Sequence, residues 1–542
     1  MPRSAVPEGD LGCAAICNQC KLPLNWKVRF GESPGPQLEV VGPQKLEVRT
    51  MKNTRISTGV DGLDEILKGG FIRGTSYLIL GGTGTGKTVL SLQACQESVK
   101  RKESCLYFTF SEPEASIRGH ADSLGWDLAK VVFVDFTREL GRAKINDEYS
   151  VFPPSEVEET PIWSHLYQAV GEHDPALVVI DSATFLRYLS RDEYQFRKLG
   201  QKLINTLGSR GCVSLFLFEP AELEKETSPA LAVDCVVAMR NDLTEQKTTE
   251  IRTIEVKKMR GSSFLAGRHP MRIGEAGITV WPHRIEHVKK SIPYDRNIVP
   301  SGIAELDQLL KGGFSTGTCT IFTGPSGAGK TTLATQFLCV AAEKGVKGAM
   351  YSFEEWGVSI LSRCNAVSIP LKEHTEKHTV LLREVNPLEY YPDEFLEMFR
   401  KDVEKDGIQL VVLDSLRGYN LAMEGFGNLV AHMQNIINYC RSQKITLMLV
   451  EELQTIFGDV RITNKGVSYM ADNVLMLSYA KHHGRLIKVI NCLKKRLGDF
   501  EPELREFQIT GHGIVVGERL DHLRGLLTGV PTAEQEKPEP KE

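Results

Sequence analysis

Two glycine-rich loops constrain this chain more than any other feature of its sequence. Both match G-x-x-x-x-G-K-[ST], in which backbone N–H groups surround phosphates, the lysine reaches the β and γ phosphates and the hydroxyl helps to hold Mg²⁺. Each follows a short apolar run, so the sequence predicts two sites for ATP with Mg²⁺. The expected ATP-binding residues are Gly81, Gly82, Thr83, Gly84, Thr85, Gly86, Lys87 and Thr88 in the first loop, and Gly324, Pro325, Ser326, Gly327, Ala328, Gly329, Lys330, Thr331 and the following Thr332 in the second.

The two loops belong to a longer internal repeat. The segment 58–71 (TGVDGLDEILKGGF) recurs as 301–314 (SGIAELDQLLKGGF), and Lys87 and Lys330 keep the same separation of 243 positions (330 − 87). An ungapped register of this length indicates an internal duplication.

The length and composition fit two soluble domains with end segments. A chain of 542 residues is too long for one hydrophobic core. We expect a flexible N-terminal arm at 1–53, a first repeat at 54–285, a second repeat at 295–517 and a C-terminal regulatory helix with a disordered tail at 518–542. No apolar run is long enough to span a membrane and no signal peptide is visible, which predicts a cytoplasmic protein. The net charge of −4 argues against a nucleic-acid partner, although it is compatible with a local basic groove.

The N-terminal arm carries three clustered cysteines, Cys13, Cys17 and Cys20. A structural zinc site needs four ligands, and no fourth Cys or His lies nearby, so we favour a disordered extension over a metal site. The other cysteines lie mostly in apolar runs, which predicts buried, reduced thiols.

Short apolar runs alternate with amphipathic stretches in both halves. This alternation is typical of parallel strands buried on both faces by helices, so the predicted fold class is α/β, with a mostly parallel sheet between helices in each half and the site at the carboxyl ends of the strands. The expected strands are 77–80, 105–110, 131–135, 177–181 and 213–218 in the first half, and 319–322, 349–353, 380–385, 410–414 and 446–450 in the second.

Carboxylates at the ends of these strands are the candidate metal and catalytic groups. Asp181 and Asp414 each end an aliphatic run and would orient Mg²⁺ together with Thr88 and Thr331. In the second half, Glu354 and Glu355 follow a strand and would polarise the attacking water or hydroxyl. In the first half, the same register reads Ser111 and Glu112, so one of the two carboxylates is a serine there.

These motifs together resemble the KaiC family of double RecA-like ATPases over residues of about 54–530. The resemblance implies two tandem RecA-like P-loop NTPase domains, ATP hydrolysis and a two-tiered homo-hexamer with ATP at the subunit interfaces. In that family a basic segment reaches the nucleotide of the neighbouring subunit; the matching residues here are Lys258, Arg260, Lys494 and Arg496. The resemblance also implies a signalling or clock role.

The family also implies serine/threonine autokinase activity in the second domain. The expected phosphosites are Ser468 and Tyr469, with Thr463 upstream, and Glu354 would be the base. Tyrosine replaces the family's threonine, which argues against a full two-site cycle. The amphipathic segment 518–529 resembles the family's C-terminal regulatory segment, where a regulatory protein would bind; a plain terminal helix is the alternative.

Two other classes of protein remain open at the level of sequence. The first is a RecA- or RadA-type DNA-dependent ATPase, a recombinase or helicase, which the tandem cores and the acidic balance disfavour. The second is a signalling scaffold that uses ATP only to assemble, which Ser111 makes reasonable for the first half.

Overall fold

The structure is a computed structural model that describes most of the chain from Thr54 onward. The N-terminal arm with its three cysteines, and the phosphosites Thr463 and Ser468, lie outside the described residues. The described ranges are 54–137, 161–188, 190, 193–219, 233–243, 250–286, 297–423, 428–453, 469–482, 485–520, 523–524 and 532–533.

Each half contains one nine-stranded sheet. In the first half the strands are β3 (Ser76–Leu80), β4 (Cys105–Thr109), β5 (Val131–Asp135), β6 (Leu177–Asp181), β7 (Val213–Phe218), β8 (Cys235–Leu243), β9 (Glu250–Met259), β10 (Arg268–Gly274) and β11 (Gly277–Val280). In the second half they are β14 (Cys319–Gly324), β15 (Gly348–Ser352), β16 (Val380–Glu384), β17 (Leu410–Asp414), β18 (Thr446–Glu452), β19 (Asn473–His482), β20 (Arg485–Lys495), β21 (Arg505–Thr510) and β22 (Gly513–Arg519).

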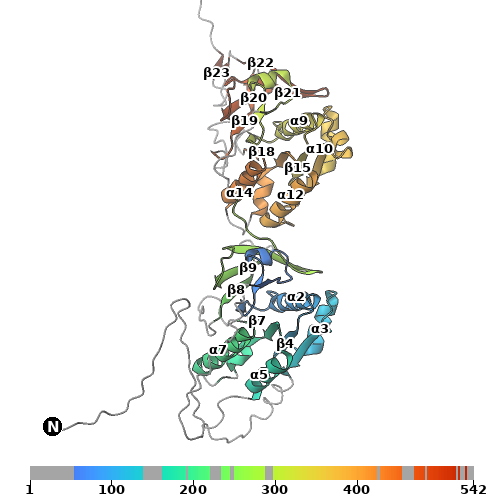
Figure 1. Ribbon diagram of the computed structural model, residues 1–542. Helices are drawn as coiled ribbons and strands as arrows, with labels where there is room; N and C mark the ends of the chain where they lie inside the picture. The colour runs from blue at the N-terminus through green and yellow to red at the C-terminus, as the bar shows by residue number, and fades with distance from the viewer. Residues whose placement is uncertain are drawn as a thin grey trace, which may run out of the picture. The chain divides into compact units, whose positions relative to one another are not determined.

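The two sheets have the same topology. The first runs β5-β4-β6-β7-β3-β8-β9-β10-β11 and the second β16-β15-β17-β18-β14-β19-β20-β21-β22. In each, the first six strands are parallel and the last three continue the sheet as antiparallel neighbours (Figure 1). All ten strands expected from the apolar runs are present, and the predicted α/β class with two tandem RecA-like sheets is confirmed. The antiparallel extensions were not foreseen.

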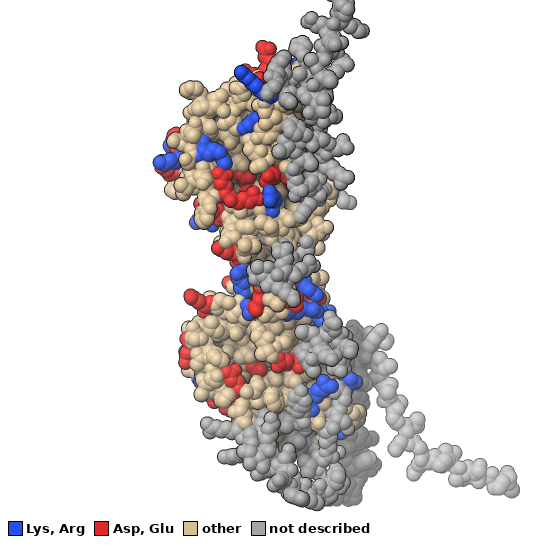
Figure 2. Space-filling model, turned by 180° about the vertical axis from the view of Figure 1, so that it is seen from behind, with Lys and Arg blue, Asp and Glu red and all other residues tan. Residues whose placement is uncertain are grey.

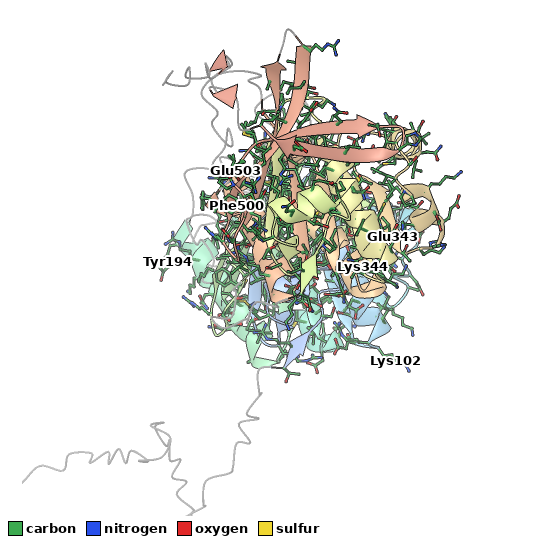
Figure 3. The ribbon with its side chains drawn as sticks, turned by 90° about the horizontal axis from the view of Figure 1, so that it is seen from above. Lys102, Tyr194, Glu343, Lys344, Phe500 and Glu503 are labelled. Carbon is green, nitrogen blue, oxygen red and sulfur yellow. The ribbon has the colours of Figure 1, made fainter. Side chains whose placement is uncertain are left out.

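Helices cover both faces of each sheet. The first half has α1 (Leu63–Ile66), α2 (Lys87–Lys100), α3 (Glu114–Ser123), α5 (Pro161–His173), α6 (Ala183–Tyr188) and α7 (Glu193–Ser209). The second has α8 (Ala304–Leu309), α9 (Lys330–Glu343), α10 (Gly357–Ala366), α11 (Leu371–Glu376), α12 (Pro392–Asp406), α13 (Leu416–Ala422) and α14 (Leu429–Ser442). Lys102 and Lys344, labelled in Figure 3, are exposed just beyond the ends of α2 and α9.

The alternation of side chains along the strands builds two cores in each half. In β6, Leu177 and Val179 join the core under α2 and α3, whereas Val178 and Ile180 join the core under α5 and α7. All four side chains are buried because successive residues of a strand point to opposite faces of the sheet and helices cover both. The second half repeats this arrangement, with α9 to α11 on one face and α12 to α14 on the other.

Helix α12 shows how local sequence sets the bounds of an element. Pro392 occupies its first turn, where a missing N–H costs nothing, and Asp393 and Glu394 follow, where negative charge is stabilised by the helix dipole. The helix ends at Gly407, whose φ of 68° is the left-handed conformation that suits glycine.

The C-terminal helix predicted over 518–529 is wrong where the structure describes that segment. Glu518 and Arg519 end strand β22, and the two residues of β23 (Leu523–Arg524) pair with β24 (Thr532–Ala533). Arg519 pairs with Arg505 of β21, so the sheet continues into the start of the segment that was expected to be helical. Among the described residues, no helix is long and apolar enough to cross a membrane.

Candidate functional site

Both phosphate loops lie between the central strand of a sheet and the helix that follows it. The first connects β3 to α2, and the second connects β14 to α9. Gly86 and Gly329 precede the two helices with φ of 97° and 108°. A Cβ on Gly329 would lie 2.7 Å from Cδ1 of Ile509, so packing as well as backbone conformation requires glycine. A helix N-terminus directed at such a loop favours a bound anion.

The two loop lysines turn back into their own loops. Lys87 Nζ donates hydrogen bonds of 2.8 Å to the carbonyl oxygens of both Gly81 and Gly82, and Lys330 Nζ donates one of 2.7 Å to Pro325. Burial lowers the pKa of both lysines, more than the neighbouring carboxylates raise it. An ammonium group that is at least partly buried, as both of these are, is a suitable partner for a phosphate.

The strand-end aspartates meet the loop threonines, as the sequence predicted for a Mg²⁺ site. Thr88 donates a hydrogen bond of 2.9 Å to Asp181, and Tyr107, on the neighbouring strand, donates one of 2.7 Å to the same oxygen. In the second half, burial raises the pKa of Asp414 to about 6, although a hydrogen bond with Thr331 opposes the shift. Carboxylate and hydroxyl oxygens are the donors that Mg²⁺ prefers, so this donor set fits the ion.

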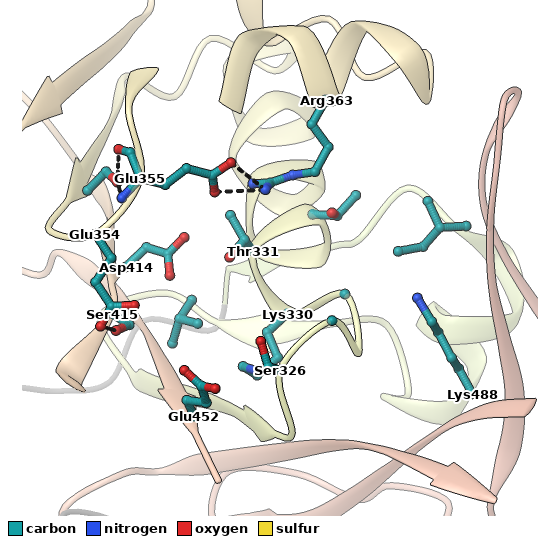
Figure 4. A pocket seen from close by; sticks show the side chains of 16 residues that line it. Ser326, Lys330, Thr331, Glu354, Glu355, Arg363, Asp414, Ser415, Glu452 and Lys488 are labelled. Atoms are coloured by element: carbon teal, nitrogen blue, oxygen red, sulfur yellow. Dashed lines mark hydrogen bonds and ion pairs between the residues drawn. The ribbon is translucent and has the colours of Figure 1, made fainter. Parts of the chain in front are cut away.

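The second half holds a cavity of about 520 Å³ around its phosphate loop (Figure 4). Lys330, Thr331 and Asp414 line it together with Glu354 and Glu355. The volume is in the range of sites for small ligands and cofactors. The structure therefore brings together candidate residues that the sequence placed at or after the ends of three separate strands.

The two glutamates of this cavity have different partners. Ser415 Oγ donates a hydrogen bond of 2.9 Å to Glu354 Oε1. Arg363 Nη1, from α10, lies 2.7 Å from each carboxylate oxygen of Glu355 (Figure 4). Neither Ser415 nor Arg363 was predicted as a site residue from the sequence, because an arginine on a surface helix and a serine after a strand-end aspartate match no motif used there.

The first half lacks this arrangement of charges. Ser111 stands where Glu354 stands in the second half, and Glu112 accepts a 2.5 Å hydrogen bond from Ser116 within its own helix-loop segment. His120 lies 3.4 Å from Glu112 and replaces Arg363 in the repeat register. The two halves therefore share the phosphate loop and the Asp–Thr pair but differ in the candidate catalytic groups.

A further glutamate in each half escaped the sequence analysis. Glu219 follows β7 and Glu452 ends β18, the strands that separate the phosphate loop from the strand-end aspartate. Each raises the pKa of its loop lysine, Lys87 or Lys330, against the effect of burial. The two residues are 233 positions apart (452 − 219), not 243, so a constant repeat register could not align them.

One model of a known protein family matches both halves of the chain. The family model described as "ATPase: KaiC" matches this chain twice, over residues 56–285 and 299–521. The chain belongs to the KaiC family. Two KaiC relatives are the circadian clock protein KaiC3 of Synechocystis sp., 27% identical over 504 residues, and the circadian clock oscillator protein KaiC of Parasynechococcus marenigrum, 25% identical over 488 residues. Both alignments cover 89% of this chain, and they cover 96% and 94% of the two relatives.

The basic residues that the KaiC resemblance singled out lie away from their own phosphate loops. Lys258 Nζ donates to the carbonyl of Val233 at 2.7 Å, just before β8 begins. The backbone N–H of Arg260 donates to Asp234, whose carboxylate in turn accepts from the first residue of β3. The phosphate loop follows the opposite end of β3, and the five residues of this strand separate its two ends by roughly 15 Å. The pair therefore cannot reach the phosphates of its own KaiC repeat.

The second KaiC repeat has the same geometry. Lys494 Nζ donates to the carbonyl of Ala471 at 2.7 Å, and Arg496 donates to that of Tyr469 at 2.9 Å. The carboxylate of Asp472 accepts a 3.0 Å hydrogen bond from the backbone N–H of Cys319, the first residue of β14. The basic side chains therefore lie near the start of that strand. Tyr469, 60% exposed, thus lies at the end of the sheet opposite to Glu354. The structure does not bring the candidate phosphosite and the candidate base of one chain together.

Proposed function

We propose that this KaiC-family protein, in the cytoplasm, binds ATP with Mg²⁺ in both repeats and hydrolyses ATP in the second. The single observation that carries the proposal is the cavity in which Lys330, Thr331, Asp414, Glu354 and Glu355 meet. Oxygen donors for the ion, a buried cation for the phosphates and a carboxylate base for the nucleophile are the parts that phosphoryl transfer needs.

Each residue has a separate task in this proposal. The backbone of the second loop and Lys330 would bind the β and γ phosphates, while Thr331 and Asp414 would hold Mg²⁺. The ion would neutralise charge on the phosphates as the γ-phosphoryl group leaves. Glu354 is the proposed base, since its carboxylate lines the cavity and Ser415 fixes one of its oxygens. Glu355 is oriented by Arg363, so that its charge stays beside the site without turning toward the phosphates.

The paired substitution Glu354→Gln with Glu355→Gln tests the assignment of the catalytic groups. We expect ATP hydrolysis by the second repeat to be lost, with nucleotide binding retained, because the amides keep the shape but cannot accept the proton. Exposed Glu376→Gln on α11 is the matched control and should leave hydrolysis unchanged. Hydrolysis that persists in the double variant, measured in a Lys87→Ala background, would show that another group is the base.

We also propose that the protein forms a two-tiered homo-hexamer with ATP at the subunit interfaces. The support is that Lys258, Arg260, Lys494 and Arg496 lie at the end of the sheet opposite to their own loops. Cations placed there can neutralise phosphate only on another protomer. A regulatory protein would bind the C-terminal segment 518–542. Sedimentation of the wild type with and without Mg-ATP tests the assembly, and a monomer under both conditions would contradict it.

Autophosphorylation in the second repeat is proposed as a reaction between protomers. Tyr469 lies at the opposite end of the sheet from Glu354, and the six residues of β14 alone span roughly 20 Å. Only a neighbouring subunit could therefore present Tyr469 to the γ phosphate; Ser468 and Thr463, which lie outside the described residues, are the other proposed acceptors. Intact-mass analysis after incubation with ATP tests this, with Ser468→Ala and Tyr469→Phe to locate the group. An unchanged mass would leave an ATPase without kinase activity.

A DNA-dependent motor is the less favoured function. On the face seen in Figure 2, the described basic side chains are scattered among acidic ones and do not form a continuous stripe. Proteins that follow a nucleic-acid backbone generally present such a stripe. Hydrolysis that rises several-fold on adding single-stranded DNA would favour the motor. Assembly with ATP but no hydrolysis would favour the scaffold.

A further inference from the structure

Two histidines and an aspartate meet outside the nucleotide sites. His283 follows β11 of the first repeat, Asp393 lies in the first turn of α12, and His432 lies on α14. One ligand atom from each lies within 4.8 Å of the others. All three residues belong to the compact unit formed by Arg55–Glu542. None of them takes part in the proposed function.

Two separations within this cluster are close to the edge length of a tetrahedral metal site. His283 Nδ1 lies 3.0 Å from Asp393 Oδ1, and His432 Nε2 lies 3.4 Å from the same oxygen. Zinc binds imidazole nitrogen and carboxylate oxygen at about 2.0–2.2 Å, which separates neighbouring ligand atoms in a tetrahedron by about 3.4 Å. An ion could therefore lie among the three atoms with small side-chain movements.

His432 supplies an independent observation that points to a ligand. Its side chain is 4% exposed, and Nε2 has no hydrogen-bond partner among the described residues although it is directed at the cluster. Its other ring nitrogen, Nδ1, lies 2.6 Å from the hydroxyl oxygen of Tyr419. When Nδ1 carries the proton and donates to Tyr419, Nε2 presents a lone pair to the cluster. This is the arrangement by which a second partner orients a metal-binding histidine.

The neighbouring histidine is not part of the ligand set. His269 Nδ1 accepts a 2.9 Å hydrogen bond from the backbone N–H of His283, and its Nε2 lies 3.2 Å from the carbonyl of Leu265. Both of its nitrogens are therefore occupied. His269 instead fixes the backbone that carries His283, which supports the position of that ligand.

We propose that His283, Asp393 and His432 form a binding site for a zinc-class divalent cation, with a fourth position open to water. Two imidazoles and one carboxylate suit Zn²⁺ or Co²⁺ and are poor ligands for Mg²⁺, which prefers oxygen. Because His283 follows the last strand of the first repeat and the other ligands lie on helices of the second, the ion would bind the end of one repeat to the other.

The test uses untagged, full-length protein in which Cys13, Cys17 and Cys20 are replaced by serine, so that the N-terminal cysteines cannot hold the ion. After treatment with a chelator and gel filtration, we would add Co²⁺ in the presence of excess Mg²⁺. We expect about one Co²⁺ per chain with the visible absorption of four-coordinate cobalt. Zn²⁺ should displace it and raise the thermal midpoint.

Single substitutions locate the ion. His432→Ala and Asp393→Asn should each weaken Co²⁺ binding by more than about 10-fold, the lower range for losing even a supporting residue. His283→Ala changes a side chain that is 38% exposed and should have the same effect without disturbing the core, so it serves if the others fail to fold. Buried His374→Ala, outside the cluster, should bind normally. No stoichiometric binding, or binding that His283→Ala leaves unchanged, means an adventitious ion only and overturns the proposal.

Discussion

Arg363 binds Glu355 across the second nucleotide cavity, with one guanidinium nitrogen 2.7 Å from each carboxylate oxygen. Arg363 lies on α10 and Glu355 on the loop before it, so this pair connects a surface helix to the end of β15. The counterpart in the first repeat is the contact between Glu112 and His120. The repeats thus differ at the place where the chemistry of hydrolysis would occur.

Replacing Arg363 should impair the chemical step more than the binding of ATP. In Arg363→Ala, Glu355 loses its orientation and its charge can approach the phosphates, so we expect kcat to fall by about 10–100-fold. The KM for ATP should change less, because Lys330 and the loop remain. Steady-state kinetics on the Lys87→Ala background measure both. His120→Ala is the matched change in the first repeat, and an equal loss from it would contradict the assignment of hydrolysis to the second repeat.

The two loop lysines should separate assembly from chemistry. Lys87→Ala removes the phosphate contact in the repeat that lacks a second glutamate, so we expect weaker ATP-dependent assembly. Lys330→Ala should instead abolish most hydrolysis. Analytical ultracentrifugation and phosphate release, measured on the same samples, distinguish the two effects. If Lys87→Ala assembles like the wild type, ATP in the first repeat does not hold subunits together.

Asp414 should make the nucleotide-free protein less stable at higher pH. Its pKa in the folded state is raised from 3.8 to about 6 by burial. The contribution of the protonated Asp414 carboxyl group to the free energy of unfolding is therefore fully present below pH 3.8, and it is lost as the pH rises through about 6. Asp414→Asn cannot ionise, so in chelator without nucleotide it should be more stable than the wild type at pH 8, by up to about 3 kcal/mol.

Chemical unfolding at pH 8 and pH 5 checks the sign of this effect. The advantage of Asp414→Asn should shrink at pH 5, where much of the wild-type carboxyl group is protonated. Adding Mg²⁺ and ATP should reverse the order, since the variant loses an ion ligand and binding stabilises only the folded state. A variant that is less stable than the wild type at pH 8 without ligand would show that the ionised carboxylate is not costly there.

The sequence predicted the parts of the fold that depend on local pattern. Runs such as 177–180 are buried on both faces of a sheet, and such positions strongly favour apolar residues, so their composition indicates strands. The phosphate loops were equally clear, because their glycines are required by geometry. The antiparallel strands β9 to β11 and β20 to β22 were not predicted. Many of their residues are polar or only partly buried, so these strands form no continuous apolar run.

Other residues of the site depend on tertiary contacts that no local pattern carries. Arg363 is one arginine on an amphipathic helix, and only folding shows that it reaches Glu355. Glu219 and Glu452 were missed because the spacing between equivalent residues of the two repeats is not constant. It is 243 positions for Ser111 and Glu354, but 233 positions for Asp181 and Asp414. The C-terminal segment illustrates the opposite error: its leucines fit a helical period, but strand pairing with β21 determined the conformation up to Arg519.

Gly329 should tolerate no side chain, for two separable reasons. Its φ of 108° is unfavourable for alanine, and a Cβ there would lie 2.7 Å from Ile509 and 2.9 Å from Phe507. Gly407, at the end of α12, has a φ of 68° but no atom within 4 Å of the added Cβ. Gly407→Ala should therefore cost about 1 kcal/mol, the penalty of the left-handed backbone alone.

Gly329→Ala should cost more, about 2–4 kcal/mol, because the clash with Ile509 and Phe507 adds to the backbone strain. The free energy of unfolding of the two variants isolates the packing contribution as their difference. Ile509→Ala should reduce the cost of Gly329→Ala when that cost is measured against the Ile509→Ala single variant, since it removes the nearest atom but leaves φ unchanged. Equal costs for the two glycines would mean that the loop moves aside, and that the close packing of β21 against the phosphate loop does not constrain it.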